Sequence, residues 1–108
     1  MSKESLLYPK IKEWILESYP NAWIYRATDT FRVGIPDIIA NIDGHFLAIE
    51  VKSDEKQQLR KIQEYELGQI EAAGGYGMAV KGDTLYWCEH ELQWKTMTLK
   101  EVLDARCD

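Results

Sequence analysis

The chain carries the sequence DIIANIDGHFLAIEVK from Asp37 to Lys52. Two apolar runs rich in β-branched residues flank Asp43-Gly44, a dipeptide strongly favoured in two-residue β-hairpin turns. The sequence therefore predicts two antiparallel strands, over residues 37–42 and 45–52. Both runs are almost continuously apolar, which predicts a hairpin inside a sheet with both of its faces covered.

A two-residue turn would also fix which residues of the two strands face each other. Ile42 would face His45, and counting outward from the turn places Asp37 opposite Glu50. Directly opposed residues share a face of the sheet, with Cβ atoms roughly 4.5 to 5.5 Å apart. Lys52, two residues beyond Glu50, points to the same face. The hairpin is thus predicted to bring two carboxylates and one ammonium group together.

Two carboxylates held this close in apolar surroundings are costly unless a positive charge compensates them. Lys52 can neutralise one of them, whereas a hard divalent cation such as Mg²⁺ would satisfy both and still leave positions for water and a phosphate. This pattern is typical of a metal-dependent phosphodiester hydrolase, in which a lysine positions the water or offsets charge on phosphorus. The alternative is that Asp37 caps the strand after Pro36, and that Glu50 and Lys52 form an ion pair on a solvated face.

The segments on either side of the hairpin show helical and strand patterns. Apolar residues at helical spacing predict a first helix up to Tyr19, which either begins near Pro9 or has an earlier turn kinked there. Residues 22–27 predict a strand, followed by a polar loop over 28–30. Later segments predict a helix over 59–73, a second hairpin over 77–88 with Gly82-Asp83 at its turn, and a helix begun by a Thr98/Glu101 capping box. The predicted order is α-β-β-β-α-β-β-α.

Gln63 lies within the apolar stripe of the predicted second helix, between Ile62 and Leu67, on the side that should face the sheet. A buried amide needs hydrogen-bond partners. Gln63 is therefore predicted either to reach the carboxylate site or to bond to a strand carbonyl.

Composition and charge set limits on the class of protein. A chain of 108 residues with 45% hydrophobic content predicts one domain over residues 1–108. The net charge of -5 argues against a protein that coats phosphates non-specifically. No segment approaches the about 20 apolar residues of a membrane span, and the start has no secretory pattern. We expect a cytoplasmic protein of a bacterium or phage-infected cell, with no membrane partner and with Cys88 and Cys107 as reduced thiols.

Three groups of residues resemble the VRR-NUC family of virus-type replication-repair nucleases. They are Gly34–Asp37, Ala48–Lys52, and Gln63 followed by Ala72–Gly75. The resemblance spans residues 4–80. Because this family belongs to the PD-(D/E)xK superfamily, the resemblance implies an α/β fold with a restriction-endonuclease-like core in the order αβββαβ, with a mixed central sheet flanked by helices.

The resemblance also implies roles for individual residues. Asp37 and Glu50 would bind Mg²⁺, or Mn²⁺ in its place, together with the backbone carbonyl of Val51. Lys52 would be the catalytic lysine, and Gln63 would orient water or Lys52.

Further candidates lie outside the motif strands. Glu4 resembles the N-terminal helix glutamate of many such nucleases, a further metal-site or water contact, although Glu13 is a competing helix carboxylate. Arg26 and Arg32 flank the loop before Gly34, where they are predicted to contact DNA phosphates.

The resemblance implies a divalent-metal-dependent DNA endonuclease that hydrolyses phosphodiester bonds. The expected substrate is branched DNA such as a Holliday junction, in DNA repair, and the expected assembly is a homodimer. Tyr86, Trp87, Trp94 and Met97 are either candidate dimer contacts or residues of the core. Two alternatives stay open, namely a non-catalytic nucleic-acid or protein-binding module on the same scaffold, and a flap- or single-strand-specific nuclease. A sequence-reading restriction-like enzyme is less favoured than recognition of shape.

Overall fold

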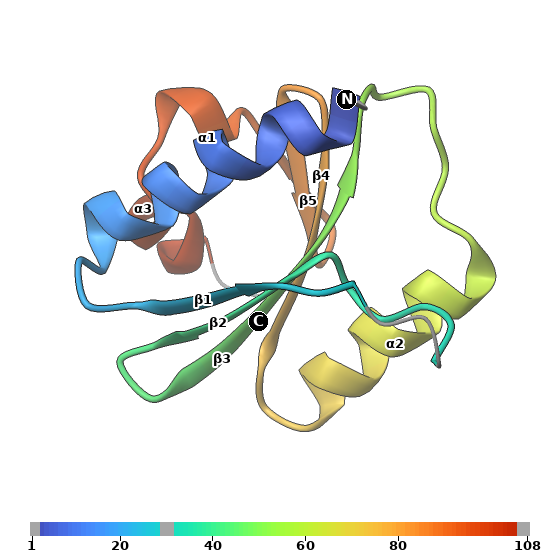
Figure 1. The fold of residues 1–108 in the computed structure, drawn as a ribbon, viewed down its shortest axis with the longest axis horizontal. Helices are drawn as coiled ribbons and strands as arrows, with labels where there is room; N and C mark the ends of the chain where they lie inside the picture. The colour runs from blue at the N-terminus through green and yellow to red at the C-terminus, as the bar shows by residue number, and fades with distance from the viewer. Residues whose placement is uncertain (1–2, 29–31, 106–108) are drawn as a thin grey trace.

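A computed structural model of the chain describes residues 3–28 and 32–105. Within these residues, one six-stranded sheet has helices on both faces, with its strands in the order β1-β2-β3-β4-β5-β6 (Figure 1). The parallel pair is β3–β4, whereas the other neighbours are antiparallel, so the sheet is mixed as predicted. The elements are α1 (Lys3–Ser18), β1 (Trp23–Arg26), β2 (Ile38–Ile42), β3 (His45–Lys52), α2 (Lys61–Ala72), β4 (Tyr76–Lys81), β5 (Thr84–Trp87), β6 (His90–Leu92), a 3₁₀ turn (Trp94–Thr96) and α3 (Leu99–Asp104).

The predicted order is confirmed as far as β5, and again for α3. β6 and the 3₁₀ turn were not predicted, because each is only three residues long and too short to show a periodic pattern. α1 begins before Pro9 and runs through it. Residues 29 and 30 of the predicted polar loop lie outside the described residues.

The β2–β3 turn confirms the predicted hairpin. Ile42 pairs with His45, and Asp43 and Gly44 both have positive φ, at 53° and 87°, as a type I′ turn requires. Pairing continues to Ile38 opposite Ile49, so the next position outward places Asp37 opposite Glu50.

The main hydrophobic core lies between the sheet and the two helices α1 and α3, which cover the same face (Figure 1). Alternate residues of the central strands point into it, and α1 contributes the fully buried Ile11 and Ile15. The Thr98/Glu101 capping box forms as predicted at the start of α3. α2 lies on the opposite face, against β3 and β4.

The prediction that both faces of the hairpin are covered is wrong near its turn. Trp23 and Tyr25 of β1 are 61% and 49% exposed, and Phe46 of β3 is 45% exposed. The strand register places these three side chains on the α2 face, because Tyr25 pairs with Ile39 and Asn41 pairs with Phe46. α2 packs on β3 and β4, so it leaves the β1 side of this face open.

For two of the four candidate dimer contacts, the structure shows the alternative, burial in the core. Trp87 and Trp94 are buried, and Trp94 packs edge-on against Trp14, with ring centroids 5.3 Å apart. These indoles belong to the core and its margin, where their apolar surface is best covered. Neither side chain is available to a second copy.

Two further expectations concern the cysteines and the membrane. Cys88 is disulfide-bonded, which contradicts the expectation of a reduced thiol at that position, and Cys107 lies outside the described residues. In residues 3–28 and 32–105, no helix is long and apolar enough to cross a membrane.

Candidate active site

Asp37 stands at the entrance to β2, and contacts from both neighbouring strands hold it there. Its backbone carbonyl accepts a hydrogen bond from the N–H of Ala27 at 2.8 Å. Its side-chain Oδ2 accepts one from the backbone N–H of Val51 at 2.7 Å. The carboxylate is therefore fixed against β3, beside Glu50.

The loop before Asp37 is fastened to α2, which explains the glycine of the Gly34–Asp37 motif. Gly34 has a φ of +86°, and a Cβ at this position would lie 2.7 Å from Cγ1 and 3.0 Å from the carbonyl oxygen of Ile62. Nearby, Arg32 donates to both carboxylate oxygens of the buried Glu66, at 2.9 and 3.0 Å. These contacts set the path by which the chain enters β2.

Glu50 is a buried carboxyl group in an unfavourable electrostatic setting. Its pKa is raised from 4.5 to about 9. Burial is the largest cause, followed by the hydrogen bond to the Asp37 carboxyl and by repulsion from it, whereas Lys52 and Arg60 act to lower the pKa. Two ionised carboxylates cannot hydrogen-bond to each other, so the bond to Asp37 exists only while one group holds a proton. When both are ionised, Oε2 of Glu50 is buried without a hydrogen-bond partner among the described residues.

Gln63 faces the sheet, as its place in the apolar stripe predicted, and is 6% exposed. Its Nε2 donates to Oε1 of Glu50 at 3.2 Å, while its own Oε1 accepts the backbone N–H of Arg60 at 2.8 Å. Of the two partners considered from the sequence, the structure therefore shows the carboxylate site and not a strand carbonyl. A role for Gln63 in orienting water or Lys52 stays a prediction.

Two cations lie near this carboxylate pair. Lys52 is half-buried, and its position two residues past Glu50 gives it the same face of β3. Arg60, the residue that precedes α2, also lowers the pKa of Glu50, and it was not among the predicted site residues. A signal was present, because a basic residue at the start of a helix is unfavourable for the helix dipole unless an anion is nearby.

The two further candidate carboxylates, Glu4 and Glu13, both lie on α1. Glu4 is in the first turn of α1, and no hydrogen bond or ion pair among the described residues joins it to Asp37, Glu50 or Lys52. Glu13 lines a pocket with Trp94, on the α1 side. A metal-site role for Glu4 stays a prediction.

The two predicted DNA-contacting arginines have protein partners. Arg26 donates to Oγ of Ser5 at 2.7 Å, and its guanidinium lies 5.1 Å from the ring centroid of Tyr8. It thus points to α1, on the face opposite the carboxylates. Arg32 is paired with Glu66. Contacts of either arginine with DNA stay predictions.

A solved structure described as a "VRR_NUC domain" is similar to this chain. It superposes with a TM-score of 0.55 and 21% sequence identity, over 76% of this chain and 86% of that chain. The chain has the VRR-NUC fold. No family model and no curated protein matches the sequence. The VRR-NUC fold agrees with the family that the sequence motifs resemble, and with its PD-(D/E)xK-like α/β architecture.

In this VRR-NUC fold, the residues around Glu50 fit a divalent cation with hard oxygen ligands. A cation would supply the positive charge that stabilises the ionised form of Glu50. It would also be a partner for Oε2 of Glu50, which has no hydrogen-bond partner among the described residues. The N–H and C=O of a strand residue face the same neighbouring strand, so the carbonyl of Val51 is turned to the Asp37 side like its N–H. Within residues 3–28 and 32–105, no group of three or more His, Cys, Asp or Glu side chains could hold a metal. The candidate ligands are thus two carboxylates and one carbonyl.

Proposed function

We propose that this protein is a divalent-metal-dependent endonuclease that hydrolyses phosphodiester bonds in DNA. The observation that carries the proposal is the carboxylate pair of Asp37 and Glu50 beside Lys52, in which Oε2 of Glu50 is buried and has no hydrogen-bond partner in the described part of the chain. A purely structural hairpin gains nothing from this arrangement, since it raises the energy of the ionised pair. The VRR-NUC fold, which the chain shares, supports the same proposal.

The residues of the candidate site have separate roles in the proposed hydrolysis. Asp37, Glu50 and the carbonyl of Val51 would hold Mg²⁺, with Mn²⁺ as a substitute, and such an ion polarises a phosphate and lowers the pKa of a bound water. Nε2 of Gln63 donates a hydrogen bond to Oε1 of Glu50, and Oε2 of Glu50 would then bind the cation. Lys52 places its ammonium group where it offsets negative charge that develops on the phosphate.

We propose branched DNA, such as a four-way junction in DNA repair, as the substrate. The net charge of -5 provides little general attraction for duplex phosphates. Binding then depends on a DNA shape that brings phosphates to the few cations at the site, Lys52 and Arg60 among them.

We further propose that two copies act as a homodimer, because two strands of a symmetric junction require two active sites. The exposed aromatic face of β1 and β3, formed by Trp23, Tyr25 and Phe46, supports this assembly. It lies on the same side of the sheet as Asp37 and Glu50. The ring planes of Trp23 and Tyr25 are 13° apart, and their centroids are separated by 5.9 Å, so they form one continuous apolar surface.

The test is cleavage of labelled four-way junction, flap, duplex and single-stranded DNA in Mg²⁺, Mn²⁺ or EDTA. Wild type is compared with Lys52→Ala and with a charge-matched control, Lys95→Ala, since Lys95 is paired with Asp83 at 2.7 Å. We expect metal-dependent cleavage, strongest on the junction, that Lys52→Ala abolishes and Lys95→Ala retains. Preference for flap or single strand would reassign the substrate, whereas failure to cut any DNA in either metal would favour the binding module.

Metal binding is measured separately from cleavage. Isothermal titration calorimetry with Mn²⁺ is expected to show binding to wild type that Asp37→Asn weakens at least tenfold. Equal binding by both proteins would show that Asp37 is not a ligand.

A further inference from the structure

Lys81 lies beside Lys52 on the neighbouring parallel strand. The two residues are register partners in the β3–β4 pair, so their side chains leave the same face of the sheet. Neighbouring strands are only about 4.8 Å apart, and like charges directly opposite each other destabilise a sheet. The pairing therefore points to anionic groups of a ligand that compensate the two ammonium groups.

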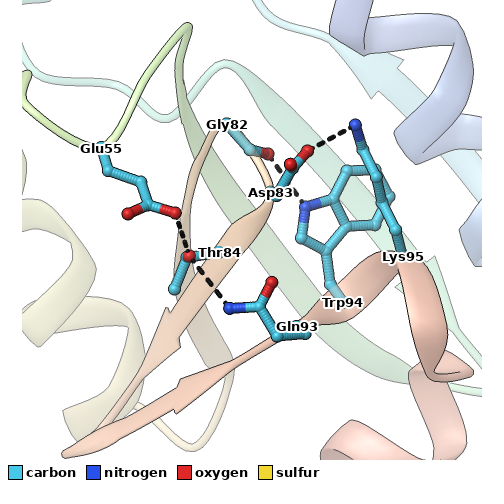
Figure 2. Close-up of polar contacts among 7 residues, drawn as sticks. All are labelled: Glu55, Gly82, Asp83, Thr84, Gln93, Trp94 and Lys95. Carbon is cyan, nitrogen blue, oxygen red and sulfur yellow. Dashed lines mark hydrogen bonds and ion pairs between the residues drawn. The ribbon is translucent and has the colours of Figure 1, made fainter.

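The backbone around Lys81 is held firmly in place. The N–H of Gly82 donates to the carbonyl of Lys52 at 3.1 Å, which extends the parallel pairing past Lys81. On the other side of the turn, Nε1 of the buried Trp94 donates to the carbonyl of Gly82 at 3.1 Å, and Lys95 pairs with Asp83 (Figure 2). The two hydrogen bonds of Gly82 fix the origin of the Lys81 side chain relative to Lys52.

The ammonium group of Lys81 contacts an aromatic ring and could still bind an anion. It lies 5.0 Å from the ring centroid of Tyr86, and no ion pair with a carboxylate forms among the described residues. Burial raises the pKa of Tyr86, and the nearby carboxylates of Glu91 and Glu55 raise it further. Glu55 accepts a hydrogen bond from Oγ1 of Thr84, the β5 partner of Lys81 (Figure 2).

On the basis of the nuclease function proposed above, we propose that Lys81 binds a non-bridging oxygen of the DNA phosphate next to the one that meets Lys52. A phosphodiester chain offers successive anions, and two adjacent lysines on one rigid edge can each bind one. The repulsion between the two ammonium groups is then relieved in the complex. Lys81 is a substrate-binding residue in this arrangement, whereas Lys52 acts at the reacting phosphate.

The test measures binding without cleavage, by fluorescence anisotropy of a labelled four-way junction in EDTA, between about 50 and 200 mM KCl. Lys81→Gln is compared with Lys95→Gln, which removes the same charge from a lysine that already has a partner. Each phosphate contact contributes about 0.9 to the slope of log affinity against log salt. We expect Lys81→Gln to weaken binding several-fold and lower this slope by about one, Lys81→Arg to restore both, and Lys95→Gln to retain the wild-type slope.

Steady-state cleavage in Mg²⁺ gives an independent readout. Lys81→Gln is expected to raise KM several-fold with little change in kcat, because a contact made equally in the ground and transition states affects binding alone. Equal slopes for Lys81→Gln and Lys95→Gln, or a loss confined to kcat, would overturn the assignment of Lys81 while leaving the nuclease in place. A wild type that neither binds nor cuts DNA would overturn both proposals.

Discussion

Gln63 joins Glu50 to the start of α2. Its Nε2 donates to the carboxylate of Glu50 at 3.2 Å, and its Oε1 accepts the N–H of Arg60 at 2.8 Å. One buried amide thus satisfies a carboxylate of the candidate site and an N–H at the helix start, which otherwise lacks a helical partner. The position of α2 and the orientation of Glu50 are therefore coupled through this side chain.

Gln63→Ala is expected to destabilise the protein by about 1–3 kcal/mol, because it leaves buried polar groups without partners. Urea unfolding measures the loss. Gln69→Ala is the matched control, since Gln69 is an exposed residue of the same helix, and a change there is expected to stay within about 0.5 kcal/mol. Similar losses from both substitutions would show that the Gln63 hydrogen bonds contribute little.

The raised pKa of Glu50 predicts that stability falls as pH rises in the absence of metal. The folded state holds this proton up to a pKa of about 9, whereas the unfolded chain releases it near 4.5. The stabilisation is complete below the unfolded pKa and is lost as pH rises to the folded value, at about 1.4 kcal/mol per pH unit.

Urea unfolding in EDTA across this pH range tests the effect of Glu50. Glu50→Gln should remove this decrease of the free energy of unfolding with rising pH. The variant should therefore be more stable than wild type at the alkaline end of the range. Glu64→Gln makes the same chemical change at an exposed position of α2 and should leave the slope intact. A wild-type slope that Glu50→Gln does not alter would count against a raised pKa at this residue.

Gly34 and Gly44 provide a matched test of the loop that positions Asp37. Their φ values are +86° and +87°. A Cβ at Gly34 would meet Ile62, whereas a Cβ at Gly44 would have no atom of the described residues within 4 Å. Gly44→Ala should therefore cost only the left-handed backbone strain, about 1–2 kcal/mol. Gly34→Ala adds the clash with α2 and should cost about 1–3 kcal/mol more.

Thermal and urea unfolding measure both glycine variants. Because the Gly34 loop leads into Asp37, Gly34→Ala should also slow DNA cleavage, whereas Gly44→Ala should not. Equal losses of stability in the two variants would show that the loop moves away from Ile62 at little cost.

The proposed homodimer predicts that the exposed aromatic face controls the assembly. The double variant Trp23→Ser/Tyr25→Ser should sediment as a monomer where wild type sediments as a dimer, because it removes apolar surface that the second copy would cover. Tyr65→Ser is the control, since Tyr65 is 58% exposed on α2, outside this face. A monomeric wild type, or a double variant that still dimerises, would contradict the assignment.

The sequence alone determined the β2–β3 hairpin and the meeting of Asp37 with Glu50. Asp43-Gly44 adopts the two positive φ angles of a type I′ turn, and such a turn fixes the register of both strands. Alternation then assigns each side chain to a face. All of this depends on residues within one short stretch, so local rules suffice.

Only the tertiary structure decided what surrounds that pair. Lys81 comes beside Lys52 through a parallel pairing that α2 connects, and no local signal sets the register of such a crossover. The same packing places Gln63 and Arg60 near Glu50 and leaves Trp23 uncovered, because α2 lies on β3 and β4. The position of a helix on a sheet is set by the fit of many side chains at once, and the sequence pattern shows which side of α2 is apolar but not where on the sheet it comes to rest.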